Sequence, residues 1–448
     1  MKSLINTLTN IWKIEDLRYR ILTTLGLLMI YRFGSYVVLP GVNSNVLSAI
    51  NSSSRGGGIV DLINIFAGGA FSRASIFALG IMPYISASIV IQLLGMAIPY
   101  FQKLQKEGES GRKKINQYTR MLTVVITAFQ APGYLGTQVL SKPGVVSDPG
   151  AFWMAISILV LVTGTMFVMW MGERITDKGI GNGISLIIMV GIIARLPFAF
   201  FAELGSRFEG QGGGLIMFLI ELVLLLFIIV GSILLVQGTR RIPVQFAKKI
   251  VGNKQYGGVR QYIPLKVNAA GVMPIIFAQA IMLIPITLAQ FSESQAMAGF
   301  VGAFANPFGF LYSLVFALLI IAFTYFYTAI SVNPNQMADD MKRNGGFIPG
   351  VKPGKKTAEF IDSVMSKITL PGSIFLALVA ILPTFAVQLG ITHEFSQFYG
   401  GTSLLILVGV VLDTLQQIES HLLMRHYDGL MKSGRIKGRS SMSMASGY

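Results

Sequence analysis

The chain has no cysteine and little charge. The absence of cysteine among its 448 residues excludes disulfides, thiolate chemistry, iron–sulfur ligation and cysteine zinc sites. Only 12% of the residues are charged and 53% are hydrophobic, whereas a soluble domain carries about 25% charge. This composition indicates an integral membrane protein.

Signatures of enzymes are also missing. The sequence has no H-E-x-x-H, G-x-S-x-G or P-loop motif, and His393, His421 and His426 lack the spacing of metal ligands. The Gly-rich run at 179–183 precedes an apolar segment, so we interpret it as a loop and helix start, not as a phosphate cradle. We expect no catalytic site, no metal and no cofactor.

Ionisable side chains at membrane depth are few, although ion transporters need them. Arg32, Arg195, Glu221 and Asp413 fall inside apolar segments. For each one, an interhelical pair or a side chain that reaches the lipid headgroups is a simpler explanation than a proton relay.

Ten apolar segments have about the length of 20 residues that a membrane crossing needs. Hydropathy places them near residues 21–39, 74–98, 118–139, 151–172, 183–202, 214–237, 268–290, 307–330, 369–389 and 402–423. The chain is therefore predicted to be an all-α polytopic membrane protein with ten transmembrane helices.

A shorter apolar segment, residues 59–71, stands before the second candidate span. It is too short to cross, and the span that follows contains Gly80 and Pro83. Backbone that ends at membrane depth must be buried in protein or line a watery cavity. The segment therefore predicts a pathway through the protein.

Basic residues are distributed unevenly along the chain. If the N-terminus is cytoplasmic, thirty of the 36 Lys and Arg fall on the cytoplasmic side. The positive-inside rule then places both termini there, as an amphipathic segment over 1–20 and a tail over 424–448. The net charge of +16 is mostly a sign of topology.

Two cytoplasmic loops, 238–267 and 331–367, are longer than orientation requires and are predicted to be docking surfaces. Contact with anionic lipid is the simpler alternative for any basic loop.

The Gly-rich external segment 205–214 divides the spans into an N-terminal half, 21–204, and a C-terminal half, 215–423. Inverted-repeat transporters share such a division, so it indicates a moving pathway without naming the cargo.

Long motifs run in order along nearly the whole chain. They are SRASIFALGIMPYISASI from Ser72, EGESGRKKINQYTR from Glu107, TDKGIGNGISLII from Thr176, PLKVNAAGVMPIIFA from Pro264, FTYFYTAISVNP from Phe323 and YGGTSLLILVGVVLD from Tyr399. In order and spacing they resemble the SecY family, the channel subunits of the Sec protein translocon.

The resemblance implies two pseudo-symmetric halves around an hourglass pore that a ring of six apolar side chains constricts. By motif position the ring is Ile81, Ile85, Ile184, Ile188, Ile276 and Ile406. Taken alone, apolar pairs of this kind are ordinary helix contacts. A purely apolar ring offers no ligand to an ion and resists wetting.

The resemblance also implies a re-entrant plug half-helix over 59–69. Its residues are Ile59, Asp61, Leu62, Ile63, Asn64, Ile65, Phe66, Gly68 and Gly69, and the two glycines would let it swing. Spans two and seven resemble the sides of a lateral gate. Ser86, Gln92, Asn268 and Ile284 are its candidate residues, and Gln92 could meet Asn268 across the helix interface.

The partners that the resemblance implies are SecE and SecG type small membrane subunits, the SecA motor ATPase, the ribosome, signal sequences and nascent polypeptides, membrane lipid, and a YidC type insertase. Cytosolic partners would dock on Arg240, Arg241, Lys248, Lys249, Lys254 and Lys352. Lys352 stands where the family usually has arginine, and it supplies a point charge instead of a planar fork. Asn253 and Lys254 stand where a basic pair is frequent.

The sequence thus predicts a protein-conducting channel, not an enzyme, in the bacterial cytoplasmic membrane. It would move unfolded secretory polypeptides outward and release transmembrane segments sideways into lipid. A secondary transporter of small solutes with inverted-repeat architecture is the alternative from another class, and a structural membrane scaffold is a more distant one.

Overall fold

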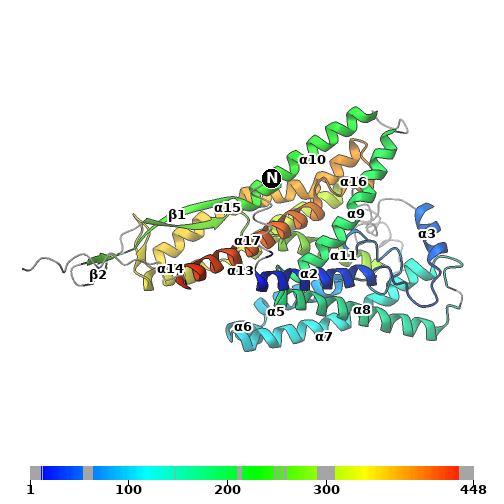
Figure 1. The fold of residues 1–448 in the computed structure, drawn as a ribbon, viewed down its shortest axis with the longest axis horizontal. Helices are drawn as coiled ribbons and strands as arrows, with labels where there is room; N and C mark the ends of the chain where they lie inside the picture. The colour runs from blue at the N-terminus through cyan, green and yellow to red at the C-terminus, as the bar shows by residue number, and fades with distance from the viewer. Residues whose placement is uncertain are drawn as a thin grey trace, which may run out of the picture.

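The structure, a computed structural model, describes residues 12, 14–53, 64–146, 148–208, 214–246, 249–251, 254–256, 260–289 and 308–432. Ten helices of at least 16 residues within these ranges overlap the ten predicted spans. They are α2 (Glu15–Gly34), α5 (Met82–Ala97), α7 (Glu109–Tyr134), α8 (Ala151–Lys178), α9 (Gly183–Phe208), α10 (Gly214–Gln237), α11 (Met273–Ala289), α13 (Phe310–Ser331), α15 (Lys355–Gln388) and α17 (Gly401–Lys432). Figure 1 shows them packed as one elongated bundle.

Length and apolar character identify the helices that can cross a membrane. Six described helices qualify, and the bent pair of α5 with α6 (Pro99–Lys106) makes a seventh. The protein is therefore a mostly helical, multi-pass membrane protein. The count of ten spans stays a prediction, because α2 and α7 carry charges within their first turns and the apolar stretch of α11, Met273–Met282, is short.

Two predicted spans differ from the helices that the structure contains. Helix α2 begins inside the predicted amphipathic segment and ends at Gly34, after which Val38 pairs with Ser75. The second span is helical only from Met82, because residues 71–81 form consecutive turns. Pro83 lies in the first turn of α5, where proline is tolerated, so it starts the helix instead of interrupting it.

The prediction of an all-α chain missed a small sheet. Strand β1 (Thr239–Phe246) pairs antiparallel with β4 (Arg260–Lys266) and β5 (Gly346–Phe347), and β2 (Lys249–Val251) pairs with β3 (Lys254–Tyr256). Alternate residues of β1, Ile242 and Val244, are buried in a cluster with side chains of α14 (Pro334–Arg343) and α15. The two predicted docking loops therefore fold together as one module.

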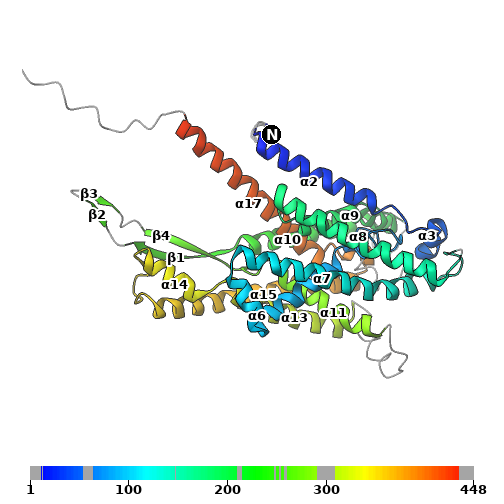
Figure 2. The same cartoon turned by 90° about the horizontal axis from the view of Figure 1, so that it is seen from below.

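The sheet module and the opposite end of the bundle are far apart. The β1–β4 hairpin and α14 project from one end in both views (Figures 1 and 2). The other end, which we call the distal end, contains α3 (Ser44–Ser53), the C-terminal end of α9 and the N-terminal end of α10. The π-helix η1 (Leu135–Leu140) continues α7, and α16 (His393–Ser396) precedes α17.

The Gly-rich run at 179–183 is a loop and helix start, as predicted. The side chain of Asn182 accepts hydrogen bonds from the backbone of Ile184 and Ser185 at the start of α9. Thr24 of α2 and Gln417 of α17 accept backbone N–H groups of the same loop. The loop therefore joins helices from both ends of the sequence.

Candidate channel constriction

The six isoleucines of the predicted ring come together in the central apolar cluster. Four are almost fully buried there, and Ile184 and Ile276 pack against it partly buried. Ile81 immediately precedes α5, and the other five lie in α5, α9, α11 and α17, so the ring joins segments that are far apart in the sequence. Apolar burial favours such convergence, at about 25 cal/mol for each Å² removed from water.

A small cavity of about 10 Å³ lies within this cluster. Four ring residues line it, namely Ile85, Ile188, Ile276 and Ile406, and Phe66 of the predicted plug faces it together with them. Gln279 and Thr402 add two polar side chains at its edge. The structure thus places part of the predicted plug directly against the predicted ring.

The described part of the predicted plug is a compact turn. Asn64, Ile65 and Phe66 are helical and buried, whereas Ile59, Asp61, Leu62 and Ile63 lie outside the described residues. Gly68 and Gly69 have φ of 61° and 86°, which side chains other than glycine rarely adopt. The Gly69 N–H donates to the Asn64 carbonyl at 2.8 Å, and the Asn64 side chain accepts from the Ser72 N–H.

Two arginines hold this turn, and the sequence analysis did not find their role. Arg32 of α2 and Arg73 both donate to the Gly68 carbonyl, at 2.7 and 3.0 Å. Their guanidinium groups lie 5.0 and 4.2 Å from the centre of the Tyr36 ring, within reach of a cation–π interaction. Arg32 was expected to form an interhelical pair or to reach the headgroups, but it donates to the Gly68 carbonyl and, at 3.1 Å, to the Tyr36 hydroxyl.

Helix α9 approaches the same turn without a side chain between them. A Cβ atom on Gly191 would lie 2.6 Å from the Phe66 carbonyl oxygen, closer than real contacts allow. A Cβ on Gly68 would lie 3.0 Å from the Gly191 Cα. Glycine at both positions lets the turn pack against α9, three residues after the ring residue Ile188.

The predicted gate residues make contacts within their own segments. Ser86 donates to the Met82 carbonyl and Gln92 donates to Ser88, both inside α5. Asn268 is buried, and its side-chain oxygen has no hydrogen-bond partner among the described residues. The structure does not join Gln92 to Asn268. Ile284 belongs to α11, and its side chain lies outside the described residues.

The predicted docking residues belong to the sheet module. Arg240 and Arg241 are exposed on β1, opposite Leu265 and Pro264, and Lys352 is exposed just before α15. Lys249 and Lys254 lie in β2 and β3, whereas Lys248 and Asn253 are outside the described residues. Nearby, a hydrogen bond from Lys356 holds the pKa of Glu359 below its usual value.

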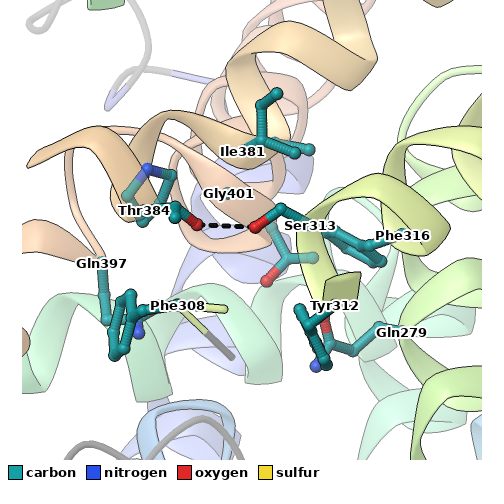
Figure 3. A pocket seen from close by; sticks show the side chains of 12 residues that line it. Gln279, Phe308, Tyr312, Ser313, Phe316, Ile381, Thr384, Gln397 and Gly401 are labelled. Carbon is teal, nitrogen blue, oxygen red and sulfur yellow. Dashed lines mark hydrogen bonds between the residues drawn. The ribbon is translucent and has the colours of Figure 1, made fainter. Parts of the chain in front are cut away.

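A small pocket of about 30 Å³, lined by both polar and apolar side chains, lies between α11, α13, α15 and α17. In Figure 3 the hydroxyl groups of Ser313 and Thr384 meet across it, at 2.9 Å. Gln279 and Thr402 line both this pocket and the ring cavity. The residues that line the pocket are all uncharged, so it offers hydrogen bonds but no ionic ligand.

The fold and this centre define a class of protein. Long apolar helices cross a membrane, and where they converge the side chains form an apolar constriction instead of a catalytic constellation. Such a centre suits a membrane channel.

The chain belongs to the SecY family. The family model, SecY, matches residues 75–415. The protein translocase subunit SecY of Mycobacterium bovis is 45% identical over 435 residues, which cover 93% of this chain and 97% of the relative. Protein translocase subunit SecY of Halalkalibacterium halodurans is 44% identical over 435 residues, with 95% and 99% covered.

Solved structures share the fold at low sequence identity. One, described as "The structure of a protein conducting channel", aligns with a TM-score of 0.62 at 16% identity, over 90% of this chain and 92% of that chain. Another, "Sec61 in the Canine ribosome-channel complex from the endoplasmic reticulum", has a TM-score of 0.58 at 15% identity, with the same coverage. Membership of the SecY family makes this chain a protein-conducting translocation channel and not an enzyme.

Proposed function

We propose that the six isoleucines constrict the path of the polypeptide and that the segment over 59–69 closes this path as a plug. The observation that carries the proposal is the cavity that Phe66 shares with Ile85, Ile188, Ile276 and Ile406. Isoleucine offers no ligand to ions, and its contacts do not depend on the sequence of the passing chain. The ring therefore blocks small ions while it accepts varied polypeptides.

Arg32 and Arg73 hold the plug in the closed channel. Each donates a charge-assisted hydrogen bond to the Gly68 carbonyl, and such bonds contribute about 1.5–3 kcal/mol each. The positive φ values at Gly68 and Gly69 supply the hinge beside them. Opening would break both bonds and carry Phe66 away from the ring.

Helices α5 and α11 form the lateral gate, through which transmembrane segments of the cargo reach lipid. The two helices contact each other in the structure, and Ser86, Gln92, Asn268 and Ile284 belong to this side of the channel. The two halves, 21–204 and 215–423, move relative to each other as the gate opens. The Gly-rich connection near 205–214 joins them.

The protein acts in the bacterial cytoplasmic membrane with both termini in the cytoplasm. The sheet module then faces the cytosol, where exposed Arg240, Arg241 and Lys352 receive the ribosome or a SecA type motor. A structural relative was solved in a ribosome–channel complex, which supports the first of these partners. SecE and SecG type subunits and a YidC type insertase complete the assembly in the membrane.

A stalled secretory precursor tests the path directly. The chain has no native cysteine, so Ile81→Cys and Ile276→Cys each provide one thiol at the ring. A cysteine in the stalled precursor should form a disulfide with both, whereas Phe227→Cys, exposed on α10, should give none. Uptake of a small solute by proteoliposomes without precursor translocation would favour the transporter alternative instead.

The gate has a separate test. Ser86→Cys with Ile284→Cys should crosslink in the resting channel and block secretion until the disulfide is reduced. Failure to crosslink at rest would reject this gate geometry but leave the ring assignment intact.

A further inference from the structure

A buried charge network lies at the distal end, away from the ring. Arg207, near the end of α9, donates to the carboxylate of Glu203 at 2.9 Å and to that of Glu221 of α10 at 2.5 Å. It also donates to the Gly390 carbonyl at 2.9 Å. All three side chains are at most 3% exposed. Glu221 therefore forms an interhelical pair, as its position in an apolar span led us to expect.

The two carboxylates have unequal partners. Glu203 accepts from Arg207 and from both the N–H and the hydroxyl of Thr392. Glu221 accepts from Arg207 through one oxygen, and its other oxygen is buried with no partner among the described residues. The hydroxyl of Tyr399 is likewise buried and without a partner there. One oxygen of Glu221, an acceptor, and the Tyr399 hydroxyl, a donor, are thus both without a partner among the described residues.

The network contains two carboxylates and one guanidinium. Glu221 is the only charged residue of α10, and α17, which packs on α10, has none before Asp413. Arg195, another cation of α9, lies beside the turn at Gly69 and not beside the two carboxylates. The segment before α17 contributes His393, which is exposed, and Glu394. No second cation among the described residues of these elements faces the two carboxylates.

Tyr399 does not change the net charge of the Glu203–Arg207–Glu221 network. Burial raises the pKa of its hydroxyl, and the carboxylates of Glu221 and Glu203 raise it further. The phenol therefore stays protonated and acts as a neutral neighbour that can donate to a carboxyl oxygen or accept from one.

An unbalanced negative charge in this place is costly. A buried ion without a counter-ion loses its hydration, and real proteins avoid the penalty by neutralising the group. Where two carboxylates share one site, one of them keeps a proton and the pair titrates together.

We propose that the Glu203–Arg207–Glu221 site binds one proton at neutral pH, on the oxygen of Glu221 that has no partner among the described residues. The site is then electrically neutral: one ionised carboxylate, Glu203, balances Arg207. Glu221 still accepts from Arg207 through its other oxygen. The proton comes from water and returns to water when the ends of α9 and α10 become hydrated.

Infrared spectroscopy of the full chain in lipid nanodiscs tests the proposal without any transport measurement. A protonated carboxyl group gives a carbonyl band that shifts to lower frequency in D₂O. The wild-type spectrum at neutral pH should contain one such band that is lost in Glu221→Gln. It should also be lost in Glu203→Gln, because removal of one negative charge leaves Glu221 balanced by Arg207 alone.

Glu173→Gln is the matched control. Glu173 pairs one-to-one with Arg120, so its replacement should leave the band unchanged. Each variant is isosteric, and an unchanged gel-filtration profile confirms that it is folded. A band that survives in Glu221→Gln, a wild-type spectrum without the band, or a band of full size in Glu203→Gln would each overturn the proposal.

Discussion

The ring and the distal charge network are both buried where helices converge, but different forces hold them. The ring consists of isoleucines and contributes many weak, non-directional contacts. The network joins α9, α10 and the chain at Gly390 and Thr392 through directed hydrogen bonds to charged groups. Apolar contacts can be exchanged for contacts with a passing chain at small cost, whereas a buried charge cannot lose its partner cheaply. The centre is therefore suited to open, and the distal joint to stay closed.

The largest effect should follow from Arg207→Met. The buried Glu203 carboxylate loses its counter-ion and Glu221 loses a hydrogen-bond donor, so we expect a loss of about 3–5 kcal/mol in the free energy of unfolding. Thermal unfolding in detergent measures it. Arg120→Met removes a pair whose arginine side chain is 47% exposed and should cost no more than about 1 kcal/mol. Equal losses in both variants would erase the contrast between buried and exposed pairs.

Gly191→Ala should have the next largest effect on stability, and this effect should be local to the ring. The new Cβ would lie 2.6 Å from the Phe66 carbonyl oxygen, and overpacking of this kind costs about 1–3 kcal/mol. The turn that carries Phe66 must move, so ion leak through proteoliposomes should rise. Gly205→Ala in the same helix is the control, because its Cβ would meet nothing within 4 Å. A leak that is equal in both variants would argue against a plug at this place.

Arg32→Gln should also favour the open plug, but more weakly than Gly191→Ala. It removes one charge-assisted bond to the Gly68 carbonyl, worth about 1.5 kcal/mol, while Arg73 still donates to the same oxygen. We expect a roughly tenfold shift toward the open plug, visible as export of precursors with weak signal sequences. Arg32→Lys should restore part of the closure. Signal selectivity that stays at the wild-type level would show that Arg32 only stabilises α2.

The smallest effect should come from Ile406→Val. Loss of one methyl group from a buried isoleucine costs about 0.5–1.5 kcal/mol, and the ring stays apolar. Ion leak should therefore match the wild type, whereas Ile406→Asn, which places an amide in the cavity, should raise it. A leak in Ile406→Val as large as in Ile406→Asn would mean that exact shape, not apolar character, makes the seal.

The sequence predicted the helices, and the residues that meet in the central apolar cluster, better than the groups that hold the turn at Gly68. Hydropathy measures how apolar a segment is, and ten helices overlap the ten segments it identified. The ring residues came from motif resemblance, because apolar pairs at this spacing occur in every span. Arg32 and Arg73 could not be assigned from sequence, since their shared partner is a backbone carbonyl. A carbonyl has no sequence signature.

Arg207 was missed for a different reason. It stands in the stretch GSRFEGQGGG, which was predicted to be an external loop from residue 205 on. Helix α9 continues through Phe208 and turns Arg207 toward Glu203, four residues earlier on the same face. The sheet, in contrast, had a signal: Ile242 and Val244 alternate with exposed residues in β1, as expected of a strand with one buried face.

Helix α15 has a mechanical consequence. Its 34 residues form one helix that begins just after Lys352, at the sheet module, and ends at Gln388, just before Gly390 of the charge network. At 1.5 Å per residue it is a rod of about 50 Å, well over the roughly 30 Å thickness of the lipid interior. A tilt of about 5° around its middle would move each end by about 2 Å in opposite directions. A force applied at the sheet module would therefore reach the charge network at the other end of the helix with its direction reversed.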